Sequence, residues 1–213
     1  KFILRIEDTD TERSKPEYEK EIIENLKLLG TFWDEGPYRQ SERLHIYAKY
    51  IKNFLDSGLA FYCFHSKEFL DKEYEEQIAT KKNPAHYCEF RKLPTEDAEN
   101  RLRHEKGIIR FKTPPDLEIA FLDLIRGEIR FNSDTLGGDF SLAKALSPDS
   151  FLPLYNLAAV IDDFLMNISH VIRGEDHISN TPKQILIQQA LGFPSPKYAH
   201  LPLILGPDKS KLS

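Results

Sequence analysis

The order of strand-like and helical segments in the N-terminal third constrains this fold more than any other feature. A short apolar run at residues 2–6 and a second one at 59–64 enclose two segments with helical periodicity. The first helix is predicted to begin at a capping box of Ser14 and Glu17 and to end at Gly30. Strand, helix, helix, strand is the order of an α/β domain.

The middle of the chain has a different pattern, with charged helices and short strands that indicate an inserted α+β subdomain. Its expected elements are a helix near 68–81, a short helix after Thr95, a strand near 108–111 and two strands joined by a turn at Arg126-Gly127. The α/β pattern then returns, with apolar runs at 155–161, 168–172 and 198–205 and a helix at 181–191. We therefore expect three parts, at residues 1–60, 61–150 and 151–213.

Charge and hydropathy exclude two classes of protein. The net charge is −5, whereas domains that bind nucleic acid through bulk charge are usually basic, so an RNA partner must be held by a local basic face. No run of about 18 apolar residues occurs, so no membrane partner is expected. A cytoplasmic location follows by default, with an organelle matrix as the alternative.

Charged residues follow two of the predicted strands, at the ends where open α/β sheets bind ligands. Glu7, Asp8 and Asp10 follow the first strand and suit an ammonium or ribose group, although an acidic turn is the simpler interpretation. Arg173 follows the strand at 168–172, where its guanidinium could grip a carboxylate. The alternative for Arg173 is a surface ion pair with Glu175 or Asp176. Two such strand ends in one domain favour a ligand site.

Two further groups of residues could bind ligands. The C-terminal residues 206–213 combine a Gly-Pro turn with Lys209 and Lys211, which could neutralise phosphates, although composition alone indicates a flexible tail. Two pairs, each with one residue between its members, could form a tetrahedral zinc site, or could be buried cysteines beside unrelated histidines: Cys63 with His65, and His86 with Cys88. No P-loop, Rossmann glycine motif or catalytic triad can be argued.

The charged strand ends and their neighbours resemble the motifs of bacterial-type glutamyl-tRNA synthetases, in the same order along the chain. The matching stretches are 2–10 (FILRIEDTD), 36–41 (GPYRQS), 171–177 (VIRGEDH) with Thr181-Pro182, and 199–203 (AHLPL). The resemblance implies a Rossmann-like class I synthetase core, contributed by residues 1–60 and 151–213. It also implies that the α+β insertion at 61–150 binds the tRNA acceptor end.

The activity implied by this resemblance is that of a glutamate-tRNA ligase, which activates L-glutamate with ATP and Mg²⁺ and transfers it to tRNA(Glu). The substrate carboxylate attacks the α-phosphate itself, so the enzyme works by positioning and by stabilising charge. A monomer is expected. Whether tRNA(Gln) is also charged cannot be read from these residues.

The roles carried over by the resemblance fall into four groups. Glutamate binding is assigned to Glu7, Tyr155, Ala159 and Arg173, with Glu7 on the ammonium and Arg173 on a carboxylate. ATP binding is assigned to Glu175, Asp176, His177, Leu203, Ile204 and Leu205. Terminal-adenosine contacts of the tRNA are assigned to Arg13 and Ser14, and the phosphate-stabilising, catalytic role to Lys209 and Lys211.

Some family features are missing or altered in this chain. A His-x-Gly-His motif should precede Lys1, the lysine loop should continue past Ser213, and an anticodon-binding domain should follow, so this polypeptide alone is expected to be inactive. Family members with zinc use a Cys-x-Cys pair, in which His65 here replaces the second cysteine. The resemblance therefore places the zinc interpretation level with its alternative.

Three other functions compete with this interpretation. Glutaminyl-tRNA synthetases differ at the first motif, which in them resembles Arg-Phe-Asp-Asp-Thr-Asn. A glutamyl-Q tRNA(Asp) synthetase-like enzyme shares the catalytic core, but Thr9 and the Asp176-His177 pair favour the full synthetase. A non-catalytic tRNA-binding module derived from a synthetase is the third alternative.

Overall fold

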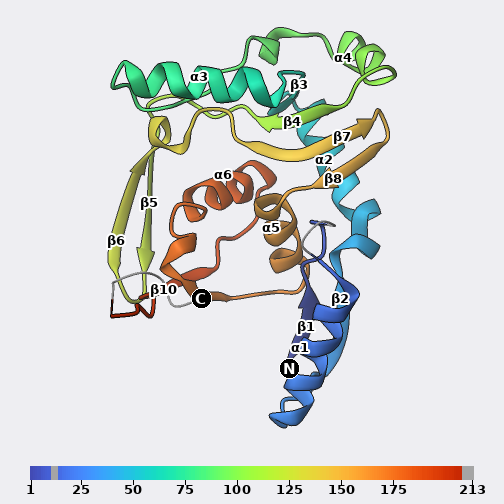
Figure 1. Cartoon of the computed structure of the whole chain (residues 1–213), viewed down its shortest axis with the longest axis vertical. Coiled ribbons are helices and arrows are strands. Elements are labelled where there is room, and N and C mark those ends of the chain that lie inside the picture. The colour runs from blue at the N-terminus through green and yellow to red at the C-terminus, as the bar shows by residue number, and fades with distance from the viewer. Residues whose placement is uncertain (11–13, 208–213) are drawn as a thin grey trace.

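The computed structural model describes residues 1–10 and 14–207. Helices α3 and α4 lie at one end of the molecule, α1 lies at the other, and α5 and α6 lie between them (Figure 1). The described strands form three sheets, β1-β2, β6-β5-β10-β9 and β3-β4-β7-β8. In the part of the chain that the structure describes, no helix is both long and apolar enough to span a membrane.

The N-terminal unit has the predicted first strand and two helices, but an unpredicted strand lies between the helices. Its elements are β1 (Ile3–Ile6), α1 (Pro16–Leu28), β2 (Glu35–Arg39), a 3-10 turn (Gln40–Arg43) and α2 (Leu44–Asp56), and β1 pairs with β2 in parallel. The predicted capping box of Ser14 and Glu17 is wrong. The helix begins at Pro16 after Lys15, with no side-chain cap among the described residues. Proline suits this first position because its fixed φ is helical and the missing N–H would have no intrahelical partner.

The second unit is an antiparallel sheet covered by two helices. Its elements are β3 (Ala60–Cys63), α3 (Lys67–Ala79), a 3-10 turn (Glu89–Lys92), α4 (Thr95–Leu102), β4 (Gly107–Phe111), β7 (Ser141–Ser147) and β8 (Ser150–Pro153). The pairings β3-β4, β4-β7 and β7-β8 are all antiparallel. This arrangement agrees with the α+β pattern expected for the middle of the chain.

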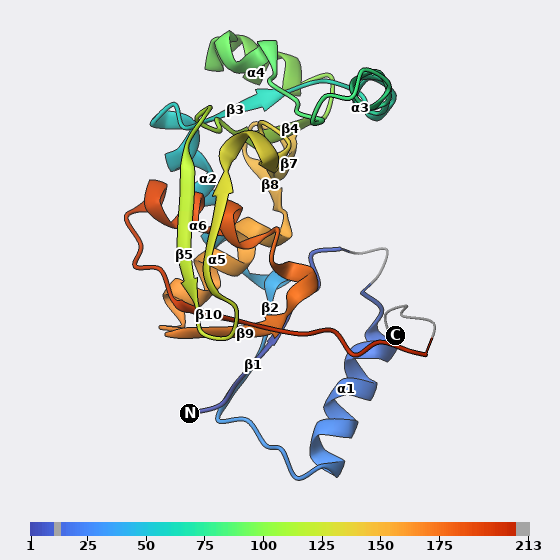
Figure 2. The same cartoon turned by 90° about the vertical axis from the view of Figure 1, so that its left-hand side faces the viewer.

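The third unit carries the second charged strand end. Its elements are β5 (Glu118–Asp123), β6 (Gly127–Asn132), a 3-10 turn (Ser133–Leu136), α5 (Tyr155–Leu165), β9 (His170–Gly174), a 3-10 turn (Glu175–His177), α6 (Thr181–Leu191) and β10 (Lys197–Leu201). Strand β10 pairs in parallel with both β9 and β5. The β5–β6 hairpin, which comes from the middle of the chain, is therefore part of the sheet that contains Arg173 (Figure 2).

One hydrophobic core joins these units. Its fully buried side chains come from α2, β4, β7, α5 and α6, and include Tyr47, Phe54, Ile51, Ile109, Leu142, Leu157, Ile161 and Ile187. The apolar residues whose helical spacing predicted α2 lie on the face that enters this core, where Tyr47, Ile51, Phe54 and Leu55 are buried. Because α5 and α6 pack in the same core as α2, this core also holds the ends of β9 and β10 in place relative to α2.

A buried carboxylate, Asp162 on α5, holds α2 and the turn before it against this core. Its Oδ2 accepts hydrogen bonds from Gln40 Nε2 at 3.0 Å and from the Tyr47 hydroxyl at 2.8 Å. Its Oδ1 accepts from Arg43 Nε at 3.0 Å, and the Asp162 side chain is 0% exposed. A buried charge with this many partners is costly to disturb, because each lost bond leaves a desolvated group.

We predict that Asp162→Ala lowers the free energy of unfolding by about 3–5 kcal/mol, as expected for breaking a buried ion pair. Urea unfolding monitored by circular dichroism measures this. The control is Asp149→Ala, which removes an exposed pair with Lys52 (Nζ to Oδ1 2.6 Å) and should change the stability far less, because water screens such a pair. Equal losses in the two variants would contradict the structural role of Asp162.

Candidate functional site

A pocket of about 470 Å³ lies between the two charged strand ends. Its walls come from β1, α5 and β9: Ile3, Leu4, Arg5, Glu7, Tyr155, Ala159, Asp163, Met166, Ile168, His170, Val171, Ile172 and Arg173. The structure therefore brings together Glu7, Tyr155, Ala159 and Arg173, the four residues that the sequence assigned to a single ligand. Their individual roles stay predictions.

Arg173 is held by uncharged groups. Its Nε, Nη1 and Nη2 donate to His200 Nε2 at 3.2 Å, to the Tyr155 hydroxyl at 3.3 Å and to Thr181 Oγ1 at 2.7 Å. No ion pair joins Arg173 to another residue within 1–10 or 14–207, so the alternative of a surface pair with Glu175 or Asp176 is wrong. A guanidinium without a carboxylate partner at a pocket wall is suited to bind one from a ligand.

The opposite wall of the pocket is acidic. Arg5 Nη2 donates to Glu7 Oε1 at 2.9 Å, and Arg5 Nη1 donates to Asp163 Oδ1 at 2.7 Å. Burial raises the pKa of Asp163 above its ordinary value, and the nearby Arg5 offsets this only in part. Two carboxylates share one guanidinium here, so this wall suits a ligand cation.

Sequence reasoning missed Arg5 and Asp163 as members of the site. Arg5 stood inside the first matching motif, two residues before Glu7 and so on the same face of the strand. Asp163 follows Asp162 at the end of an apolar helix, and two successive acidic residues there were the available signal.

The predicted nucleotide residues lie next to the pocket, beyond β9. Glu175 forms an ion pair with Arg126 from the turn of the β5–β6 hairpin, and its Oε1 accepts from the backbone N–H of Leu203 at 3.0 Å. The His177 ring lies 5.4 Å from the ring of Tyr155, and a Cβ on Gly174 would come within 2.5 Å of Asp176 Oδ1. The backbone after residue 202 is thereby held beside residues 174–177.

The remaining predicted residues of the nucleotide and tRNA contacts fall in several places. Ile204 and Leu205 are exposed. Ser14 donates its backbone N–H to the Asp10 carbonyl at 2.9 Å and lines a neighbouring hollow with β1 and α1, not the pocket of Arg173. Arg13, Lys209 and Lys211 lie outside the described residues.

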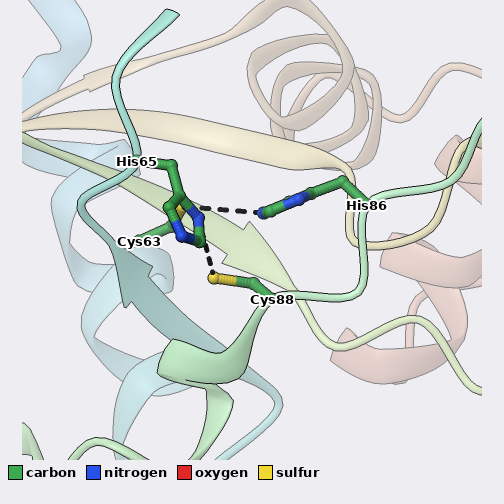
Figure 3. A group of neighbouring side chains, drawn as sticks. All are labelled: Cys63, His65, His86 and Cys88. Carbon is green, nitrogen blue, oxygen red and sulfur yellow. Dashed lines mark hydrogen bonds between the residues drawn. The ribbon is translucent and has the colours of Figure 1, made fainter. Parts of the chain in front are cut away.

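The two cysteine-histidine pairs converge, as one interpretation of their spacing predicted (Figure 3). One ligand atom from each of Cys63, His65, His86 and Cys88 lies within 4.8 Å of all the others. His65 Nδ1 lies 3.6 Å from both sulfur atoms, and His86 Nε2 lies 3.9 Å from Cys63 Sγ. A tetrahedral zinc ion with ordinary Zn–S and Zn–N bonds requires S···N separations of about 3.6 Å.

The second nitrogen of each imidazole contacts a carboxylate. His65 Nε2 lies 3.0 Å from Glu89 Oε1, and His86 Nδ1 lies 2.6 Å from Glu73 Oε2. Histidines that bind metals characteristically donate their other N–H to such a group, which fixes the tautomer. The hydrogen bond between the two cysteines lowers the pKa of Cys63 and raises the pKa of Cys88, so one thiolate is present and binding of a metal would remove the second thiol proton. The donor set therefore fits a zinc ion.

The loop of His86 is held by close backbone contacts. His86 N–H donates to the Gly137 carbonyl at 3.0 Å, and Asp139 N–H donates to the His86 carbonyl at 2.8 Å. Gly138 has φ of +77°, and a Cβ there would lie 2.4 Å from the His86 carbonyl oxygen. Only glycine allows the two backbone segments to come this close, and their contact holds the His86 imidazole beside Cys63 at the end of β3.

Comparison with known proteins agrees with the fold class. The family model described as tRNA synthetases class I (E and Q), catalytic domain, matches residues 1–213. A glutamate-tRNA ligase of Hydrogenobaculum sp. is 54% identical over 213 residues, and one of Sulfurihydrogenibium sp. is 50% identical over 221; each alignment covers the whole chain and 45% of the relative. The crystal structure of an Elizabethkingia meningosepticum glutamate tRNA ligase in complex with its amino acid matches 99% of this chain and 44% of its own, with a TM-score of 0.85 and 39% identity. The chain thus spans less than half the length of these relatives.

Proposed function

This chain belongs to the catalytic-domain family of class I tRNA synthetases for glutamate and glutamine, and on that premise we propose that it carries the amino-acid-activating site of a glutamate-tRNA ligase. The observation that carries the proposal is the pocket between β1 and β9, with carboxylates on one wall and Arg173 on the other. A free amino acid is a zwitterion, so a pocket with separated charges of opposite sign complements it. The names of the relatives support glutamate as that amino acid.

The proposed mechanism is positioning. Glu7 accepts hydrogen bonds from the substrate ammonium, while Arg173 donates to a substrate carboxylate beside the Tyr155 hydroxyl. The α-carboxylate of the substrate would attack the α-phosphate of ATP, break its bond to the β-phosphate and release pyrophosphate. ATP would lie against residues 174–177 and 203–205, and the Mg²⁺ that accompanies it would offset phosphate charge. No protein nucleophile is required, because orientation and charge stabilisation lower the barrier.

The partners and the wider setting are part of the same proposal. The glutamyl group would then be transferred from the adenylate to the terminal ribose of tRNA(Glu), and AMP would leave. The insertion at 61–150 would bind the acceptor end, and Lys209 and Lys211 would stabilise the phosphates. A cytoplasmic monomer is the proposed form. The antiparallel sheet with α3 and α4 supports a separate role for the insertion, since it adds a second layer beyond the pocket-bearing sheet.

The test is aminoacylation of purified tRNA by the complete reading frame that contains these 213 residues. We predict glutamate charging, and a fall of about 100-fold in kcat/KM for glutamate in Arg173→Lys, because lysine cannot replace the forked hydrogen bonds of a guanidinium. The control is Arg130→Lys, an exposed arginine on β6 that pairs with Glu118 and Glu128 and should leave the rate unchanged. Charging with another amino acid, or equal rates in both variants, would overturn the proposal.

We also propose that Cys63, His65, His86 and Cys88 hold one structural zinc ion, which would link the end of β3 to the loop before residue 89. Elemental analysis should find about one zinc per chain, and a chelator should lower the melting temperature. His86→Ala should lose the metal, whereas His104→Ala, at an exposed histidine outside the cluster, should keep it. A metal-free protein whose melting temperature is insensitive to chelators would refute the zinc proposal.

A further inference from the structure

A buried acid-imidazole pair lies directly behind Arg173, and the proposed mechanism assigns it no role. Both side chains, Asp123 at the end of β5 and His200 in β10, are 0% exposed. Asp123 Oδ2 lies 2.7 Å from His200 Nδ1, and His200 Nε2 lies 3.2 Å from Arg173 Nε. The three groups form a continuous chain from the hairpin to the pocket wall.

The direction of these hydrogen bonds fixes the tautomer of His200. Arginine Nε carries a hydrogen and can only donate, so His200 Nε2 must be the unprotonated acceptor. The ring hydrogen is then on Nδ1 and is donated to Asp123. Burial raises the pKa of Asp123, but hydrogen bonds from the Arg126 backbone and from His200 outweigh it and lower the pKa to about 2. Asp123 is therefore ionised at neutral pH and holds this tautomer.

The carboxylate of Asp123 is itself fixed by the hairpin turn. Its Oδ1 accepts from the backbone N–H groups of Ile125 at 3.0 Å and Arg126 at 2.9 Å. Its Oδ2 accepts from the His200 backbone N–H at 3.1 Å as well as from the ring. Each oxygen faces only donors, so the group has one orientation.

Arg173 has five N–H groups, and the bonds to His200, Tyr155 and Thr181 account for three of them. The two others, on Nη1 and Nη2, have no hydrogen-bond partner among the residues that the structure describes. We propose that Asp123 and His200 are positioning residues, which hold the guanidinium by its Nε so that these two N–H groups face a substrate carboxylate. This inference rests on the proposed glutamate site and adds the groups that set its geometry.

The sharpest test is Asp123→Asn in the complete reading frame. Because Oδ1 must stay on the two turn N–H groups, the new NH₂ faces His200 Nδ1, and the imidazole must move its hydrogen to Nε2. The ring then points an N–H at the N–H of Arg173, so the acceptor is lost with almost no change in volume. The new ring N–H can donate only to Thr181 Oγ1, which lies 3.0 Å from Nε2, and the His200 backbone N–H keeps its longer contact with Oδ1 at 3.3 Å. We expect KM for glutamate to rise about 10-fold or more, the effect of losing one hydrogen bond to a charged group, while KM for ATP changes little.

A second pair of variants keeps the test informative where Asp123→Asn folds poorly. His200→Gln retains an acceptor that can reach Arg173, whereas His200→Phe retains only a ring. The glutamine variant should recover most of the affinity for glutamate that the phenylalanine variant loses. The matched control is Tyr198→Phe, which removes a buried hydrogen bond from Gln188 Nε2 (2.9 Å) in the same strand. Phenylalanine keeps the ring that lies 5.7 Å from Arg173 Cζ and stacks on His200, so the chain of three groups stays intact.

The outcomes separate this inference from the proposed function. Absence of glutamate-dependent activity in the unmodified protein would defeat the function itself. An active protein in which Asp123→Asn has the glutamate KM of Tyr198→Phe would overturn the positioning role. So would a parallel rise of KM for glutamate and ATP with an equal loss of melting temperature in the glutamine and phenylalanine variants, since that pattern is a purely structural effect.

Discussion

Two successive carboxylates at the end of α5 hold the two halves of the site together. The described part of β1-β2 makes no strand pairing with the sheet of β9 and β10, so no backbone ladder sets the distance between Glu7 and Arg173. Asp162 instead anchors the chain around α2 from within the core, and Asp163 binds Arg5 of β1 at the pocket wall. The pocket keeps its shape because the single helix α5 binds both the chain around α2 and strand β1.

The electrostatics of the pocket follow from how differently its two arginines are held. Arg5 is shared between Glu7 and Asp163, so its charge is more than balanced and that wall stays acidic. Arg173 contacts an imidazole, a phenol and a hydroxyl, so its charge is not neutralised by any described carboxylate. The carboxylate nearest to it in the chain, Glu175, is occupied by Arg126. A ligand with both charges meets complementary groups at each end.

Features that depend only on neighbouring residues in the sequence were predicted correctly. The α/β class was predicted, and α6 was predicted to its end residues because Pro182 and Gly192 mark both termini. Convergence of Glu7 with Arg173 was also predicted, and convergence of the four cysteine and histidine residues was one of two interpretations left open. The residues that hold the site residues in place were not predicted. Arg5 contacts Asp163, 158 residues away in the sequence, and His200 contacts Asp123, 77 residues away. Such partners are set by packing of distant elements, and single residues carry no signal of it. The prediction of a capping box was wrong because α1 begins at Pro16, two residues after Ser14.

The central claim is that the acidic wall binds the substrate ammonium and the Arg173 wall binds a carboxylate. Competition by glutarate, which has both carboxylates of glutamate but no ammonium, tests it directly in the complete reading frame. Glu7→Gln should weaken binding of L-glutamate about 10-fold or more, as for a lost hydrogen bond to a charged group, while inhibition by glutarate stays the same or improves. If the substitution weakens L-glutamate and glutarate by the same factor, Glu7 does not bind the ammonium and the account is wrong.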